Sequence, residues 1–359
     1  MKYLTEYRNP ALVKDYLAKI HRAALHPWKI MEVCGGQTHS LVKNGMLGLL
    51  PENVVMIHGP GCPVCVTPMS LIDQAVQLSL LPDVILCSFG DMVRVPGNRM
   101  SLLQAKARGG DVRILYSPLE AVHIAAANPA KQVVFFAVGF ETTAPSNALA
   151  ILYAKKLGVS NFALLASHVL VPPAMEAILD DPFCSIDGFL GAGHVCAIMG
   201  LGEYHPLAAK YRVPIVVAGF EPVDLLRAIY HTVLQLESGQ YEVENQYTRA
   251  VREEGNKRAK EVMYEVFEVG SQEWRGIGHI PDSGLVIKDT YRAFDASRIF
   301  MLANRYANRP SACIAGDILK GYKKPFECPA YGKACIPANP LGAPMVSSEG
   351  ACAAYYNYR

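Results

Sequence analysis

Short apolar runs recur along the first two-thirds of the chain, and each is followed by a loop and then a helical pattern. We interpret the following runs as strands: KIMEV (29–33), VVMIH (54–58), VILCS (84–88), VRILY (112–116), VVFFAV (133–138), FALLAS (162–167) and PIVVA (214–218). Buried runs that alternate with helices predict βαβ units and parallel sheets. The predicted fold class is therefore α/β, with two doubly wound parallel-sheet α/β domains and a distinct C-terminal region.

Changes in the pattern suggest where the domains end. AVGFETTAP (137–145) and VAGFEPVD (217–224) echo one another, which suggests related α/β layers. The segment 242–268 is charged and helical in pattern, and the chain after Ser311 is rich in Pro, Gly and Cys. A loop-dominated region of that kind needs a covalent or metal staple. We expect one α/β domain over residues 1–125, a second over 126–240, and a C-terminal domain over 241–359.

Composition excludes several classes of partner. The net charge is only +2 and no dense Lys/Arg cluster occurs, so the sequence predicts no basic surface for binding nucleic acid. The N-terminal residues carry charges throughout, so they do not resemble a signal peptide. The most apolar segments, such as VVFFAVGF from Val133, fall far short of the roughly 20 residues of a membrane helix. We expect a cytoplasmic protein that binds neither nucleic acid nor membrane.

Ten cysteines in a cytosolic chain indicate metal binding or redox chemistry before a disulfide framework. Three lie early, at Cys34, Cys62 and Cys65, and four lie in the last 47 residues, at Cys313, Cys328, Cys335 and Cys352. The remaining Cys87, Cys184 and Cys196 lie in or beside apolar runs, where packing is the expected role. Two separate chemistries are the natural interpretation.

The early cysteines follow predicted strands. HGPGCPVC (58–65) lies between VVMIH and a helical pattern in which Thr67 is a candidate N-cap and Pro68 the first helical residue. Cys62 and Cys65 thus lie at a strand's carboxyl end and near a helix N-terminus, which favours thiolate. MEVCGGQTH (31–39) repeats the layout with Cys34. If both strands share one parallel sheet, all three sulfurs share its carboxyl edge.

Each group of cysteines leaves alternatives open. Cys62-x-x-Cys65 is half a zinc site, a thiol–disulfide couple, part of an iron–sulfur site or a pair placed by packing alone; no second C-x-x-C exists, so we favour the redox couple over zinc. The four C-terminal cysteines are separated by 14, 6 and 16 residues, which lacks the close pairs of zinc ribbons and favours a [4Fe–4S] cluster over zinc. His39 is a candidate to orient or deprotonate Cys34, with a structural histidine as the alternative.

Six motifs together carry a family resemblance. They are CGGQTH (34–39), GPGCPVC (59–65), FGDMVRVPG (89–97), GFETTAP (139–145), SHVLVPPA (167–174) and MVSSEGACAAYY (345–356). In this order they resemble the hydrogenase maturation factor HypD family over nearly the whole chain. Members work with the small protein HypC as the scaffold on which the Fe(CN)2CO group of [NiFe]-hydrogenases is assembled.

The resemblance implies roles for individual residues. Cys34 would bind the transient iron of the Fe(CN)2CO group jointly with a cysteine of HypC, and cyanide would arrive from HypE. Cys62 and Cys65 would carry out thiol–disulfide redox work, and the four C-terminal cysteines would hold a [4Fe–4S] cluster. A redox-active assembly scaffold is therefore expected, rather than a conventional turnover enzyme.

The chain departs from the family pattern at two positions. CIAGD (313–317) and GAPMVS (342–347) have Ala315 and Pro344 where relatives often have cysteine, and we expect those two cysteines to pair with each other in relatives.

Two other functions compete with the assembly scaffold. One is a stand-alone thiol–disulfide oxidoreductase with an iron–sulfur cluster. The other is a zinc-stabilised binding module. The sequence contains no P-loop or G-x-G-x-x-G motif to support nucleotide use.

Overall fold

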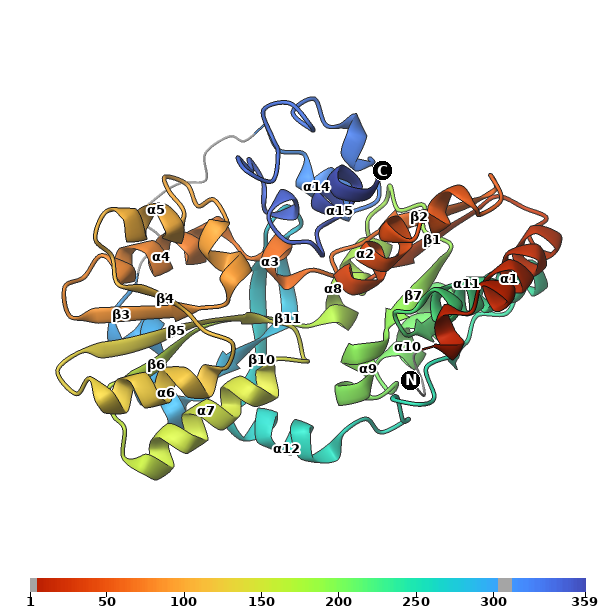
Figure 1. Cartoon of the computed structure of the whole chain (residues 1–359). Helices are drawn as coiled ribbons and strands as arrows, with labels where there is room; N and C mark the ends of the chain where they lie inside the picture. The colour runs from red at the N-terminus through yellow and green to blue at the C-terminus, as the bar shows by residue number, and fades with distance from the viewer. Residues whose placement is uncertain (1–4, 303–311) are drawn as a thin grey trace.

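The computed structural model describes residues 5–302 and 312–359, and its strands form two separate sheets (Figure 1). The first sheet has the order β2-β1-β7-β8-β9, and every pairing in it is parallel. Its strands are β1 (Trp28–Glu32), β2 (Val54–His58), β7 (Gly188–Ala192), β8 (Ile215–Ala218) and β9 (Val243–Asn245). The connections between them include helices, as parallel pairing requires.

The second sheet has the order β10-β11-β6-β5-β3-β4. Its parallel part consists of β3 (Val84–Ser88), β4 (Val112–Ile114), β5 (Gln132–Gly139) and β6 (Phe162–Val169). An antiparallel hairpin, β10 (Phe267–Trp274) and β11 (Gly278–Ile287), extends it beyond β6. The two sheets and their helices confirm the predicted α/β fold class.

Helices cover both faces of each sheet. They are α1 (Pro10–Ala23), α2 (Gly35–Lys43), α3 (Pro63–Val66), α4 (Met69–Ser79), α5 (Leu102–Ala107), α6 (Pro118–Ala127), α7 (Ala144–Leu157), α8 (Val171–Leu179), α9 (Gly193–Met199), α10 (Tyr204–Tyr211), α11 (Pro222–Ser238), α12 (Lys257–Val266), α13 (Ala296–Ile299), α14 (Ala315–Leu319) and α15 (Ala351–Tyr358). On the first sheet, Ile30 packs with α11, and Met31, its neighbour along β1, packs in the core that includes α8 and α10. This alternation is what a sheet buried on both sides requires.

All seven predicted runs form strands, but four strands were not predicted. The sequence GFLGA of β7 contains no β-branched residue, so propensity does not mark it, although it lies in the middle of its sheet between β1 and β8. In the hairpin β10–β11, only the end residues Phe267 and Trp274 of β10 are buried, and β10 begins inside the segment 242–268 that was expected to be helical. The earlier part of that segment contains the short strand β9 and the helix α12, so the helical pattern is confirmed only for α12.

Neither sheet corresponds to one of the consecutive segments 1–125 and 126–240. The first sheet takes strands from residues 28–58 and 188–245, and the second from 84–169 and 267–287. The chain therefore crosses between the sheets at β2–β3, β6–β7 and β9–β10. The reason is that β1 pairs with β7, a strand that comes after the whole parallel part of the second sheet.

The C-terminal region from residue 312 lies beside α2 and α3 in Figure 1. It has a small core of its own, which includes Ile318, Met345 and Cys352. Its last helix, α15, packs on α2 of the first sheet's domain through Val42 and Tyr355. Among the described residues, no helix is both long and apolar enough to cross a membrane.

The close approach of the Gly61 backbone to Val33 and Cys34 predicts that only glycine fits at position 61. A Cβ atom there would overlap the Cys34 amide nitrogen and the Val33 carbonyl carbon. We expect Gly61→Ala to lower the free energy of unfolding by about 3 kcal/mol, the upper range for overpacking a filled site. Gly48→Ala is the matched control, because a Cβ at Gly48 meets no atom within 4 Å. Chemical denaturation of the two variants measures the difference; equal stabilities would contradict the prediction.

Candidate functional site

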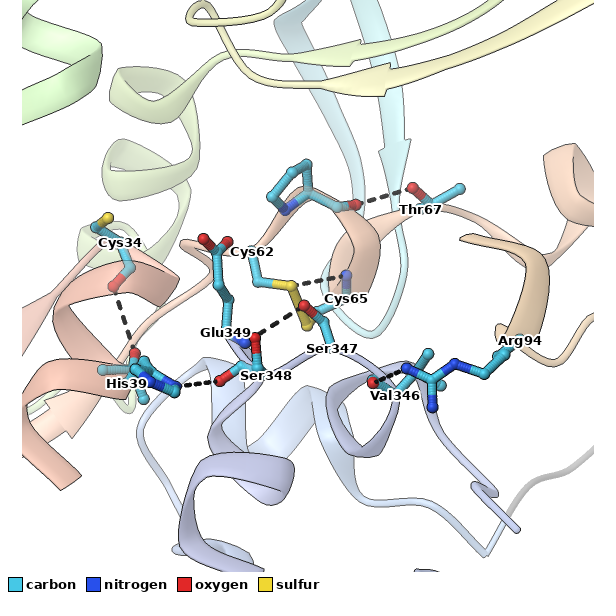
Figure 2. The surroundings of a disulfide bond; sticks show 12 residues. Cys34, His39, Cys62, Cys65, Thr67, Arg94, Val346, Ser347, Ser348 and Glu349 are labelled. Atoms are coloured by element: carbon cyan, nitrogen blue, oxygen red, sulfur yellow. Dashed lines mark hydrogen bonds between the residues drawn. A yellow bond between two sulfur atoms is a disulfide. The ribbon is translucent and has the colours of Figure 1, made fainter. Parts of the chain in front are cut away.

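The parallel pairing of β1 and β2 brings the two cysteine-bearing turns together. The strands are in register from Trp28 opposite Val54 to Glu32 opposite His58, so both chains leave the sheet at the same edge. The turns then stay in contact, because Gly35 N–H donates to the Gly61 carbonyl at 2.8 Å. Cys34 and the Cys62–Cys65 turn are therefore neighbours at the carboxyl edge of one sheet, as the sequence predicts (Figure 2).

Cys34 is the N-cap residue of α2, and only 2% of its surface is exposed. Burial raises the pKa of its thiol well above the usual range, and the carboxyls of Glu32 and Glu349 act in the same direction. The backbone N–H groups of Gly36 and Gln37 oppose that shift because they point at the sulfur from the first turn of α2. The thiol is thus held neutral in a site that already contains donors for a thiolate.

The imidazole that contacts Cys34 belongs to His194. Its Nδ1 atom lies 3.6 Å from Cys34 Sγ, and burial lowers the pKa of this histidine to about 4, so the ring is neutral. His39, the histidine singled out by sequence, instead places its Nδ1 atom 3.0 Å from the Ser348 carbonyl and packs edge-on against Tyr358. Sequence spacing favoured His39 because it lies five residues after Cys34, whereas His194 arrives from α9 beside β7.

Cys62 and Cys65 are joined by a disulfide, with their Cα atoms 5.2 Å apart. Cys62 is the N-cap of the short helix α3, and its sulfur accepts the Cys65 N–H at 3.3 Å. The predicted helix start at Thr67 and Pro68 is wrong: α4 begins at Met69, and the Thr67 hydroxyl donates to the Pro63 carbonyl. The cysteine turn forms a helix of its own, and Thr67 closes that helix instead of opening the next one.

Glu349 completes the site from the C-terminal region. Figure 2 shows its carboxylate between Cys34 and the disulfide. The backbone there is tightly packed, since a Cβ on Gly35 would lie 2.6 Å from Glu349 Cβ. Removal from water and the nearby charge of Asp91 raise the pKa of this carboxyl, while His39 lowers it. The sequence analysis used the motif MVSSEGACAAYY (345–356) for the family resemblance and for Cys352, and it did not single out Glu349.

The four C-terminal cysteines line one cavity, together with Ala315 and Pro344. Cys335 and Cys352 are buried, and Cys313 and Cys328 are half-buried. Gly342 is needed beside them, because a Cβ there would collide with Cys313 Sγ. Four thiols around a largely apolar pocket are the donor set of a [4Fe–4S] cluster, so the residues fit that group. Among the described residues, no three His, Cys, Asp or Glu side chains form a ready-made site for a single metal ion.

The cavity and the disulfide are connected by the segment 344–350. Val346 in this segment accepts a hydrogen bond from Arg94 Nη2 at 2.9 Å, and Ser347 lies beside the disulfide in Figure 2. Ala315 and Pro344 face the same cavity, so cysteines at these positions would lie near one another. Cys87 and Cys196 lie in apolar cores, as predicted.

Comparison with known proteins identifies relatives along the entire chain. The family described as "HypD: Hydrogenase formation hypA family" matches residues 11–359. The chain is 49% identical over 367 residues to the hydrogenase expression/formation protein HupD of Azotobacter chroococcum mcd 1, covering 100% of this chain and 97% of the relative. It is 46% identical over 367 residues to the hydrogenase maturation factor HypD of Escherichia coli (strain K12), covering 100% of this chain and 98% of the relative.

The disulfide generates a redox prediction. Across glutathione buffers of increasing reducing strength, Cys62 and Cys65 should change together from a linked pair to two free thiols, because one bond joins them. Trapping with N-ethylmaleimide followed by peptide mass spectrometry measures both states. Cys62→Ser is the control, and it should leave Cys65 trapped as a free thiol in every buffer. A pair that remains in one state throughout, in folded protein, would contradict the prediction.

Proposed function

The chain belongs to the HypD family of hydrogenase maturation factors, and we propose that it is the redox-active scaffold that holds iron while the Fe(CN)2CO group of a [NiFe]-hydrogenase is assembled. Its general role is hydrogenase maturation. One observation carries the finer proposal: a buried free thiol and a disulfide occupy adjoining turns at one sheet edge. Such an assembly needs an iron-holding sulfur and a thiol pair that supplies electrons in its dithiol state, of which the disulfide is the oxidised form.

Cys34 is the proposed protein ligand of the iron, which is the substrate of this scaffold. Thiolate sulfur is a soft ligand, which suits iron that carries cyanide and carbon monoxide. Iron binding replaces the thiol proton, and the N–H groups of Gly36 and Gln37 then donate to the resulting sulfur anion. The second sulfur comes from a small chaperone of the HypC type, and a donor of the HypE type supplies cyanide.

Cys62 and Cys65 supply electrons in this proposal. When two thiols form one disulfide, the S–S bond forms and two electrons and two protons are released. Starting from the dithiol state, the two electrons reduce a thiocyanate-type adduct on the HypE-type donor: its S–CN bond breaks, one proton goes to the donor's sulfur, and cyanide is released to the iron. The carboxylate of Glu349 lies between the pair and Cys34, where it can accept a proton. This arrangement keeps electron and proton release beside the iron-holding sulfur.

Cys313, Cys328, Cys335 and Cys352 would hold a [4Fe–4S] cluster in the C-terminal cavity. Such a cluster supplies one-electron transfer when bound. The chain's own contribution is the cavity, in which Gly342 leaves room beside Cys313 and apolar residues such as Ile318 and Leu341 exclude water. The segment 344–350 then links this cavity to the disulfide.

The alternative of a stand-alone thiol–disulfide oxidoreductase fits the geometry less well. Cys62 is 3% exposed and Cys65 is 1% exposed. A general oxidoreductase needs an accessible thiolate to attack disulfides of other proteins. The buried pair is better suited to reaction with a group held inside the same site.

The iron-holding role predicts the effect of Cys34→Ala. In a complex with a HypC-type partner purified anaerobically, the variant should lose the infrared bands of cyanide and carbon monoxide, because the iron lacks the sulfur that this chain supplies. The fold and the C-terminal cavity should be unchanged, since Cys34 does not line that cavity. Cys184→Ala is the matched control for removing a thiol elsewhere. Full-intensity bands in the Cys34→Ala complex would remove Cys34 from the iron site.

The cluster assignment predicts iron and sulfide in the anaerobic protein. We expect about four irons and four sulfides per chain, the content of a single [4Fe–4S] cluster. Cys352→Ala should lose most of both, because Cys352 lines the cavity, whereas Cys184→Ala should lose neither. Metal analysis and absorption spectroscopy measure the outcome. Stoichiometric zinc in protein kept anaerobic throughout would overturn the assignment in favour of a structural zinc site.

A further inference from the structure

A continuous line of buried polar side chains leads away from Cys34. Glu32, at the end of β1, has no exposed surface. Its Oε2 atom accepts the Cys34 N–H at 2.9 Å, and its Oε1 atom accepts the hydroxyl of Thr38. One carboxylate therefore holds both ends of the first turn of α2, the turn that presents the Cys34 sulfur.

His58 continues the line from the neighbouring strand. The register of the sheet places His58 opposite Glu32, and its Nδ1 atom lies 2.8 Å from Glu32 Oε1. Its Nε2 atom lies 2.9 Å from the hydroxyl of Tyr355. His58 is 3% exposed and Tyr355 is 2% exposed, so water does not replace any of these contacts.

The donors and acceptors match along the whole line. The Glu32 carboxyl oxygens are placed to accept from the Cys34 amide, the Thr38 hydroxyl and an N–H at His58 Nδ1; burial raises the pKa of this carboxyl, and these hydrogen bonds oppose the shift. That tautomer leaves His58 Nε2 as an acceptor for the Tyr355 O–H. The Tyr355 ring also packs edge-on against the imidazole, with 5.3 Å between centroids. Because each partner fixes the orientation of the next, the hydroxyl of Tyr355 influences a turn that it does not touch.

The far end of the line belongs to a different part of the molecule. Tyr355 lies on α15, one turn after Cys352, which lines the C-terminal cavity. The same helix packs on α2, which carries Thr38 and follows Cys34. The hydrogen bonds therefore join the cysteine cavity to the Cys34 turn by a path separate from the disulfide.

We infer that Tyr355 and His58 are positioning residues for Cys34: they hold Glu32 in place, so the Cys34 thiol stays buried against His194 for as long as α15 keeps its position. The inference rests on the proposed function in one respect, namely that Cys34 is the thiol that matters for iron. The positioning itself is a property of the folded chain and is tested without iron.

The test compares the reactivity of two buried thiols in one folded protein. The full chain, with the Cys62–Cys65 disulfide intact, is treated with iodoacetamide, and labelling of Cys34 and Cys196 is followed by peptide mass spectrometry. Cys196 is fully buried on α9, outside this line of hydrogen bonds. Tyr355→Phe keeps the ring and removes the hydroxyl. We expect it to raise the ratio of Cys34 to Cys196 labelling about fivefold, the size of one buried hydrogen bond.

Two further variants make the result specific. Tyr356→Phe removes a hydroxyl from the exposed neighbouring position on α15 and should leave the ratio unchanged. His58→Asn keeps an N–H donor near Glu32 but cannot reach Tyr355, so it should raise the ratio as Tyr355→Phe does. It also provides the test if Tyr355→Phe does not fold.

The outcomes separate this inference from the proposed function. A ratio within twofold of wild type in folded Tyr355→Phe would overturn the inference, and so would equal increases at Cys34 and Cys196, which indicate general loosening. If the ratio rises as expected while the wild-type complex lacks cyanide and carbon monoxide bands, the positioning role stands and the iron-scaffold proposal fails. If the wild-type complex shows those bands while the ratio is unchanged, the iron-scaffold proposal stands and the positioning role fails.

Discussion

The pairing of β1 with β2 is the constraint on which the candidate site depends. In-register parallel strands end together, so the residues that follow them, Cys34 after one strand and the Cys62–Cys65 turn after the other, have to lie side by side. The turns approach to backbone contact because Gly61 has no side chain: a Cβ there would overlap the backbone of Val33 and Cys34, while a Cβ on Gly35 would strike Glu349 of the C-terminal region. A one-residue slip of this pairing would separate Glu32 from His58 and move the cysteine turns apart.

The C-terminal region covers this edge and supplies what the two strands lack. It contributes Glu349 beside the disulfide, the Ser348 carbonyl that binds His39, and Tyr355 on His58. The Lys324 ammonium group donates a hydrogen bond to the Met56 carbonyl of β2, and burial lowers the pKa of Lys324 to about 8. Polar groups in a buried position require partners. These contacts therefore fix the C-terminal region to one particular place on the sheet.

Sequence alone predicts the parts of the site that local pattern encodes. The seven apolar runs give the strands, and glycine and proline beside the cysteines give the turns, so the shared edge of Cys34, Cys62 and Cys65 follows. Long-range placement is not encoded in this way. His194 reaches Cys34 only because β7, a strand without β-branched residues, inserts beside β1. Glu349 and Tyr355 reach the site because the chain folds back from its far end, and spacing along the sequence carries no information about that return.

The interleaving of the two sheets explains why the disulfide occupies its position. The chain leaves the first sheet after β2 and enters the second at β3, and α3 with its two cysteines lies on that connection. The second sheet also contacts the end of α3, because the N–H of Arg275, the residue after β10, donates to the Val66 carbonyl at 2.8 Å. The turn that carries Cys62 contacts the Cys34 turn through the hydrogen bond from Gly35 N–H to the Gly61 carbonyl, and Cys65 lies beside Ser347 of the C-terminal region in Figure 2. A thiol pair at this point therefore lies between the Cys34 turn and the C-terminal segment 344–350 that leads to the cysteine cavity.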